Sequence, residues 1–453
     1  MPDAATAPIT ARQRQRILIT VLFGMAANSF PVTVLSASLP RIGEDLNATV
    51  GTTAWILTAP VLAGAVATPI SGKLGDLYGH RRAYLGGFSL SVVMLALTAT
   101  SQTAGWLIGF RVAAAAAGSI TGPAAMAMII SLFKGSERET ALGYWTATAA
   151  LSPSLGVAIG GPLIDLFGWQ MLFIIQAGIA AIALTLAWFT IPETEAKPVR
   201  FDIPGAITLG AGTFALMFAI NRLGPWGLQS AAVLLSLALV PVFYLLFWTV
   251  ERRTDEPLVP PALLRRSSFV TPVAVGAVAN GAYMGAFVVT PLALEELFGF
   301  GVTAISLVML PRPISFGLSA STSGHLGQRL SNRVLIGGGI LSLAAGSSLI
   351  GLGAWSGFLV VIVLGLLAQG IGQGLQTPHL TNAVGGSMDD GDLGVGTGLM
   401  QMGIQFGTAT GMTVLVAILG DRTSPGAYAQ VFLIGGLAAA GAAVVGSRIR
   451  RPE

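Results

Sequence analysis

The chain of 453 residues contains no cysteine and few charged side chains. Without cysteine it can form no disulfide, thiolate nucleophile, iron–sulfur cluster or cysteine zinc site. Only 10% of its residues are charged, whereas an ordinary soluble domain carries about a quarter. This scarcity of charge excludes a water-soluble protein of this length and indicates a protein that crosses a membrane many times.

Signals of catalysis and metal binding are missing as well. The sequence contains no H-E-x-x-H, G-x-S-x-G or phosphate-loop pattern. The spacing of its three histidines, His80, His325 and His379, does not indicate a metal site. We therefore expect no catalytic residue, no metal and no cofactor. The net charge of +4 comes from short basic clusters between apolar runs, which argues against a nucleic-acid partner.

The chain does contain a long series of apolar runs, and its mean hydropathy is +0.76. A membrane-spanning helix needs about 20 apolar residues, and the 59 glycines suit closely packed membrane helices. The runs lie near residues 17–37, 53–72, 83–101, 105–132, 140–163, 169–190, 203–221, 228–249, 268–292, 303–323, 334–353, 357–381, 394–419 and 426–447. We predict an all-α polytopic membrane protein with fourteen transmembrane helices.

The lysines and arginines follow the positive-inside pattern. If the N-terminus is cytoplasmic, 19 of the 24 basic residues fall in cytoplasmic segments and 3 fall outside. The other 2, Arg111 and Arg312, lie within spans. We therefore expect a multi-pass protein of the cell (inner) membrane with both termini in the cytoplasm.

One short segment occurs twice in the chain. Residues 72–82 and 324–333 share two glycines, a leucine and an arginine at matching positions. This repeat indicates two duplicated six-helix bundles, with two helices inserted between them. We expect an N-terminal bundle over 1–192, the inserted helices over 193–266 and a C-terminal bundle over 267–453. Transporters built from such repeats place their site at the interface of the two halves.

The duplicated segment also carries a family resemblance. The cytoplasmic-loop signature of the major facilitator superfamily, G-x-L-a-D-r-x-G-r-r, is similar to Gly72-Lys-Leu-Gly-Asp76-Leu-Tyr-Gly79-His-Arg81-Arg82. Further similar features are Trp55-Ile-Leu-Thr58, Arg111, the glycines at 156, 160 and 161, and the segment 396–401. The resemblance implies the major facilitator fold and, with fourteen helices, the drug:proton antiporter branch. It further implies a secondary active transporter that exports amphiphilic or drug-like small molecules by alternating access. We expect a monomer surrounded by membrane lipids.

The signature segment is a candidate conformational latch. A carboxylate at Asp76 can pair with arginines or with the positive end of an adjacent helix in one conformation and lose that partner in another. The latch would consist of Gly72, Asp76, Gly79, Arg81 and Arg82. The alternative is that these residues only set topology.

A second candidate element is the run at 140–163. It contains Pro153, Gly156, Gly160 and Gly161. Small residues at four-residue spacing permit close helix packing, and proline loosens the helical hydrogen bonds. We expect either a hinge or plain close packing there.

The acidic residues depart from the family pattern. All 20 fall in loops or at helix ends. Family members commonly place an aspartate on the first helix, where a proton is exchanged, but the corresponding segment here begins at Asn28 and has no acid. A charge within the membrane is costly, so Arg111 and Arg312 need partners. Structural anchoring, contact with an anionic substrate or headgroup, and proton coupling all remain open for these arginines.

Uncharged polar residues within the spans are further candidates for the substrate path. Gln369 and Gln373 recur at helical spacing on one run, and Gln401 and Gln405 do so on the next. We favour cavity lining over helix packing for both stripes. Tyr144 belongs to a set of aromatic and methionine residues that suits an adaptable apolar pocket.

Three functional hypotheses follow from these features. The first is an exporter of amphiphilic or drug-like small molecules. The second is a transporter of anionic or lipid-like amphiphiles without the usual proton site on the first helix, in which a group such as His379 or Glu295 carries any coupled proton. The third is a transporter-like membrane sensor or scaffold. A sensor normally carries a soluble domain, and the loops here are short.

Overall fold

The computed structural model describes residues 10–29, 35, 41–48, 50–194, 201–254, 257–389, 392–420 and 422–449. Within these ranges the ordered segments are helices joined by short turns, and no strand occurs. The N-terminal half consists of α1 (Ala11–Ser29), α3 (Val50–Tyr78), α4 (His80–Ala99), α5 (Ala104–Gly118), α6 (Thr121–Leu132), α7 (Gly135–Phe167) and α8 (Trp169–Thr190).

The inserted pair and the C-terminal half complete the chain. The helices that we expect to be the inserted pair are α9 (Ile203–Trp226) and α10 (Ala231–Glu251), and the short α11 (Pro261–Arg265) follows them. The C-terminal half consists of α12 (Ser267–Phe298), α13 (Val302–Met309), α14 (Pro311–Leu326), the π-helical turn η1 (Arg333–Gly338), α15 (Gly339–Ser356), α16 (Leu359–Gly385), α17 (Leu393–Leu419) and α18 (Pro425–Gly446).

Two of the predicted spans are divided. The run 105–132 forms α5 and α6, with the division just before Pro123, and the run 303–323 forms α13 and α14, with the division at Pro311. Proline lacks the amide hydrogen that an unbroken helix requires, which accounts for both interruptions.

The described part of the chain contains eleven helices that are long and apolar enough to cross a membrane. The prediction of an all-α, multi-pass membrane fold is therefore confirmed. The helices α1 and α7 and the divided pair α13–α14 are not among the eleven. The total of fourteen transmembrane helices thus stays a prediction.

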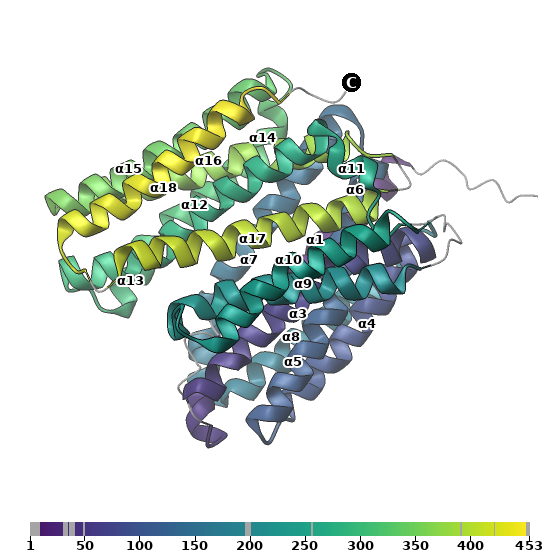
Figure 1. Cartoon of the computed structure of the whole chain (residues 1–453), viewed down its shortest axis with the longest axis horizontal. Helices are drawn as coiled ribbons and strands as arrows, with labels where there is room; N and C mark the ends of the chain where they lie inside the picture. Colours follow the sequence, from purple (N-terminus) through teal and green to yellow (C-terminus); the bar gives the residue numbers. More distant parts are fainter. Residues whose placement is uncertain are drawn as a thin grey trace, which may run out of the picture.

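The two halves lie side by side and touch along two seams (Figure 1). At one seam α3 packs against α17, and at the other α7 packs against α14. The inserted helix α9 lies over the first seam and contacts both α3 and α17, while α10 packs against α9 (Figure 1).

Small residues bring the backbones of the two halves into contact. A methyl group at Gly72 of α3 would lie 2.2 Å from the carbonyl oxygen of Gly394 in α17. At the other seam, a methyl group at Gly324 of α14 would lie 2.4 Å from the Cα of Thr140 in α7. Gly72 and Gly324 occupy matching positions of the duplicated segment, so the duplication places equivalent glycines at the two seams.

The segment after α10 packs with the N-terminal half. Leu258, Val259 and Leu263 are buried in a hydrophobic cluster that also contains residues of α4, α6 and α8. In addition, the Lys73 ammonium donates a hydrogen bond to the carbonyl oxygen of Pro257 at 3.1 Å. Residues 257–263 therefore pack into the same hydrophobic cluster as Ala206 and Leu209 of α9 and Phe247 of α10.

We predict that the inserted helices are dispensable for folding. Replacing 203–251 with a polar linker should give a monodisperse protein, because α10 packs mainly on α9 and lipid can replace α9 on the apolar seam. Size-exclusion chromatography and a thermal melt of the purified variant check this. The same linker inserted after Gly227, with both helices retained, is the matched control. Aggregation of the deletion variant at every linker length, with the control intact, would show that the pair is integral.

Candidate functional site

A cavity of about 720 Å³ lies between the two halves. Most of its lining is apolar and comes from the N-terminal half, and α12 and α17 supply the side from the C-terminal half. Its larger polar lining residues are Asn28, Arg111, Gln176, Gln401 and Gln405. Four of these five are residues that the sequence predicts for the site. Cavities of about 300–1,000 Å³ with few polar groups are typical of sites for small molecules.

Arg111 is the single charged residue among the described residues that line this cavity. Its Nε donates a hydrogen bond of 2.9 Å to the carbonyl oxygen of Ile56 in α3. Its guanidinium carbon lies 5.4 Å from the centre of the Phe173 ring, within the range of a cation–π contact. These contacts hold a fixed positive charge at the cavity wall, and none of the described lining residues is a carboxylate.

Gln176 and Phe287 also line the cavity, although neither is among the site residues predicted from the sequence. The Gln176 amide nitrogen donates at 3.4 Å to the backbone carbonyl oxygens of Ala27 and Asn28. This contact joins α8 to the end of α1. A glutamine within an apolar run is a visible signal for Gln176, whereas Phe287 is indistinguishable in the sequence from other apolar residues.

The structure places the glutamines of α16 outside this cavity. The Gln369 amide nitrogen donates to the Ser347 hydroxyl at 2.8 Å, and that of Gln373 donates to the Asn280 side-chain oxygen at 3.0 Å. Both glutamines are buried between helices of the C-terminal half. The α17 glutamines, Gln401 and Gln405, therefore line the cavity, whereas the α16 glutamines join helices to one another.

Arg312 is likewise separated from the cavity. It is 1% exposed, and its guanidinium lies 3.6 Å above the Tyr283 ring centre and 5.0 Å from that of Phe287. Its Nη2 donates to the Tyr283 backbone carbonyl oxygen. These contacts support structural anchoring, since they fasten α14 to α12 behind the cavity wall.

The remaining candidates on α7 do not join this site. Tyr144 is exposed and is not a lining residue. The predicted hinge residues lie in the middle of α7, but their side chains fall outside the described part of the chain: Pro153, Gly156, Gly160 and Gly161.

Asp76 links the two halves at one end of the molecule. Its two carboxylate oxygens accept hydrogen bonds from the backbone amides of Gly394 at 2.8 Å and Val395 at 2.9 Å. These amides belong to the first turn of α17, where the helix dipole attracts an anion. The carboxylate is 8% exposed. The sequence allows Asp76 to pair either with arginines or with the positive end of an adjacent helix, and the structure shows the pairing with a helix end.

The arginines of the signature segment make a different connection. Arg81 pairs with Glu193 and donates to the carbonyl oxygens of Ile191 at 2.7 Å and Trp188 at 3.0 Å. Arg82 lies 3.6 Å from Glu193. They tie the start of α4 to the end of α8 within the N-terminal half. The connection between halves in this segment is made by Gly72 and Asp76, and Gly79, with φ of +87°, forms the turn between α3 and α4.

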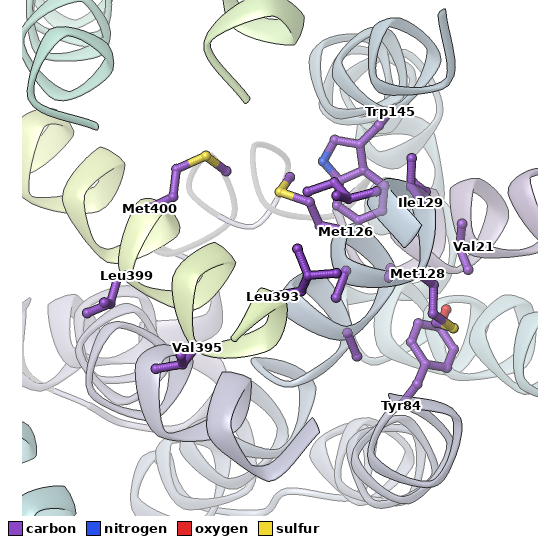
Figure 2. Close-up of a cluster of buried hydrophobic side chains, with 14 of the residues drawn as sticks. Val21, Tyr84, Met126, Met128, Ile129, Trp145, Leu393, Val395, Leu399 and Met400 are labelled. Carbon is purple, nitrogen blue, oxygen red and sulfur yellow. The ribbon is translucent and has the colours of Figure 1, made fainter. Parts of the chain in front are cut away.

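A hydrophobic cluster separates the cavity from this latch. Along α17 the latch contacts are at residues 394 and 395 and the cavity begins at Gln401. The intervening Leu399 and Met400 are buried. Figure 2 shows Met400 pointing toward Met126 of α6, with Trp145 of α7 beside it. The cluster and the latch together close the molecule at the latch end.

Known proteins share this architecture. The family model described as Major Facilitator Superfamily matches residues 21–311 and 273–453. The Multidrug transporter protein MdtP of Bacillus subtilis is 28% identical over 417 residues, covering 91% of this chain and 76% of that protein. The Methylenomycin A resistance protein of Streptomyces coelicolor is 26% identical over 451 residues, covering 96% and 95%. The solved structure of the human organic anion transporter MFSD10 has a TM-score of 0.69 at 16% identity, covering 94% of this chain and 99% of that one, which shows a shared fold.

We predict that Asp76→Asn and Gly72→Ala each loosen the latch end. The first removes the charge that binds the α17 terminus, and the second forces α3 away from Gly394. With Thr397→Cys, a buried reporter behind the latch in a chain without cysteine, either change should raise the maleimide labelling rate by about tenfold, which corresponds to about 1.4 kcal/mol.

Gly86→Ala and Glu193→Gln are the matched controls for this labelling experiment. A methyl group at Gly86 meets open space, and Glu193 pairs only within the N-terminal half in the contacts described above. Both should label at the rate of the unsubstituted reporter. Equal rates for all variants would contradict the latch.

Proposed function

The chain belongs to the major facilitator superfamily of membrane transporters, and we propose that it is a secondary active exporter of amphiphilic, drug-like small molecules. The observation that carries the proposal is the cavity of about 720 Å³ between the halves, which is mainly apolar and has a few amide groups. Relatives whose names describe multidrug transport and antibiotic resistance support the same substrate class. We assign the chain to the fourteen-helix drug:proton antiporter branch on the signature segment and the inserted pair.

Alternating access follows from the way the halves meet. They touch along α3–α17 and α7–α14, and the cavity lies between them. Asp76 and the hydrophobic cluster hold the latch end closed. Rocking the halves about the cavity would break the contacts of Asp76 with α17 and open that end. The positive-inside pattern supports a cytoplasmic latch end and cytoplasmic termini. We further propose that the protein is a monomer in the inner membrane.

A second candidate function is the transport of anionic or lipid-like amphiphiles. The specific observation is Arg111, whose charge stands at the cavity wall without a lining carboxylate. At an effective dielectric of about 20, two unit charges 4 Å apart interact by about 4 kcal/mol. Such a charge attracts an anionic or zwitterionic substrate and repels a cation. The two candidates share one mechanism and differ in the charge of the molecule carried.

Transport in proteoliposomes tests the proposed function. We predict that a fluorescent amphiphile moves uphill when a pH gradient is imposed alone, and moves less when a voltage alone is imposed. The unsubstituted protein is compared with empty liposomes. If neither gradient drives the transport of any of several amphiphiles, the proposal that the protein is an exporter is wrong.

A matched pair of fluorescent substrates that differ only in charge separates the two candidates. We predict that Arg111→Gln lowers transport of the anionic member by about tenfold, equivalent to about 1.4 kcal/mol, and spares the cationic member. Arg111→Lys should retain part of the activity, because the charge remains while the planar donor set is lost.

Arg312→Gln is the control for this substrate pair. It should lower thermal stability, since Arg312 is buried, and leave the ratio of anion to cation transport unchanged. If the unsubstituted protein prefers the cation and Arg111→Gln does not alter the ratio, the anionic candidate is wrong.

A further inference from the structure

A carboxylate and an imidazole meet in the interior between the two halves. Glu139 belongs to the first turns of α7, and His379 lies near the end of α16, so the two residues come from opposite halves. Glu139 is 2% exposed and His379 is 0% exposed. The Oε1 atom of Glu139 lies 3.7 Å from the Nδ1 atom of His379. Sequence reasoning placed Glu139 at a helix end and gave no sign of this contact.

The surroundings of the imidazole determine which nitrogen faces the acid. The His379 Nε2 atom lies 3.3 Å from the backbone carbonyl oxygen of Ser323 in α14. A carbonyl oxygen only accepts hydrogen bonds, so Nε2 carries a proton in this contact. The other nitrogen, Nδ1, is therefore the one that faces Glu139 Oε1. Asn382 orients the acid by donating from its amide to Glu139 Oε1 at 3.3 Å.

One proton decides whether this contact attracts or repels. If neither group holds an additional proton, the lone pair of Nδ1 faces a carboxylate anion in a water-poor interior, and the two repel. A proton on Nδ1 gives an ion pair, and a proton on the carboxyl group gives a neutral pair. Both forms attract, and a buried site strengthens the difference from the repelling form.

We propose that Glu139 and His379 form the proton-binding site through which pH acts on the opening of the latch end. The proposal rests on the alternating access described under the proposed function. Because each residue belongs to a different half, the pair exists only while the α7–α14 seam is closed. Opening separates the two side chains and exposes them to water at that end.

Hydrogen-bonded polar side chains run from α16, one turn before His379, to α17, one turn beyond the cavity residue Gln405. Within α16, Gln376 lies one turn before His379, and its amide donates to Gln373 at 2.7 Å. Gln373 bonds to Asn280 at 3.0 Å, and Asn280 donates to the Thr408 hydroxyl at 2.5 Å. Thr408 is one turn beyond Gln405, which lines the cavity. The buried oxygen of Gln376 and the Nδ1 of His379 have no hydrogen-bond partner among the described residues, so each retains capacity for a water or a proton.

Other charged groups stand near the pair on the neighbouring elements. On α7 these are Glu137, which pairs with Arg14 of α1 at 3.0 Å, and Arg138, whose Nε donates to the Phe133 carbonyl oxygen at 2.9 Å. On α14 the nearest ionisable residue in sequence to Ser323 is the exposed His325. Glu137 and His325 match the proposed pair in chemical type and are exposed, which makes them suitable controls.

The sign of the pH dependence follows from the two states. In the proposal the closed pair retains one proton, because the form without it places a lone pair against a carboxylate 3.7 Å away. In the open state water surrounds both groups, and glutamate and histidine then have pKa values of about 4.3 and about 6.5. Above about pH 6.5 the open pair holds no shared proton, so closing takes up one proton and opening releases it. Linkage then changes the ratio of closed to open protein by up to about tenfold per pH unit, with low pH favouring the closed state.

Distance measurements between spin labels test this proposal without a known substrate. Labels at Ser136→Cys in α7 and Gln328→Cys after α14 report the latch end, and both positions are exposed in a chain that has no native cysteine. In nanodiscs we expect the long-distance population to grow between pH 6.5 and pH 8.5. Glu139→Gln, a neutral mimic of the protonated acid, should stay at short distances at both pH values. His379→Gln should also lose the pH dependence.

Matched variants make the result decisive. Glu137→Gln and His325→Gln should shift with pH as the parent does, and Glu139→Asp should shift with an altered midpoint. Glu139→Asp also retains an acid if Glu139→Gln proves unstable. A parent-like shift in both Glu139→Gln and His379→Gln, or a parent whose distances ignore pH, would overturn the proposal. Neither result overturns the exporter, which fails separately if proteoliposomes show no gradient-driven transport.

Discussion

Direct backbone contact between the two halves is the constraint on which the other features depend. Gly72 meets Gly394 at one seam, and Gly324 meets Thr140 at the other. Because the backbones touch there, a short side chain such as Asp76 reaches the first amides of a helix in the opposite half. Closed seams also bury the cluster that separates the cavity from the latch end. A larger side chain at these glycines would hold the halves apart and weaken these contacts together.

Each seam carries one copy of the repeated segment, but the two seams use different chemistry. The first copy supplies Asp76, whereas the second copy has the exposed Gln328 at the matching position. At the second seam the buried carboxylate is Glu139 of α7, opposite His379. Asp76 accepts two hydrogen bonds from the end of α17, whereas Glu139 lies 3.7 Å from an imidazole nitrogen. The first seam thus joins a carboxylate to a helix end, and the second is the seam to which we assign the pH response.

The two arginines within the spans show how helix packing assigns roles to similar residues. Arg312 is enclosed between α12 and α14, where Tyr283 supplies both a ring face and a carbonyl oxygen. Arg111 also finds a carbonyl oxygen, that of Ile56, but it stands at the wall of the cavity. Desolvation is costly for both guanidinium groups, and each has a backbone carbonyl oxygen and an aromatic ring as partners. Only Arg111 is left where a substrate can use its charge.

The sequence alone determined the helical membrane fold and the family, because apolar run length, basic clusters and the signature segment are local properties of the chain. It also identified Asn28, Arg111 and the α17 glutamines as candidates that the structure then placed at the cavity. The sequence did not show that the α17 glutamines line the cavity while the α16 glutamines do not, because both pairs follow the same helical spacing. Only the tertiary structure brought Glu139 to His379 and Asp76 to the start of α17. Those contacts depend on which helix faces pack together across the seams. The residues involved are far apart in the sequence, so no local sequence pattern predicts that they are neighbours.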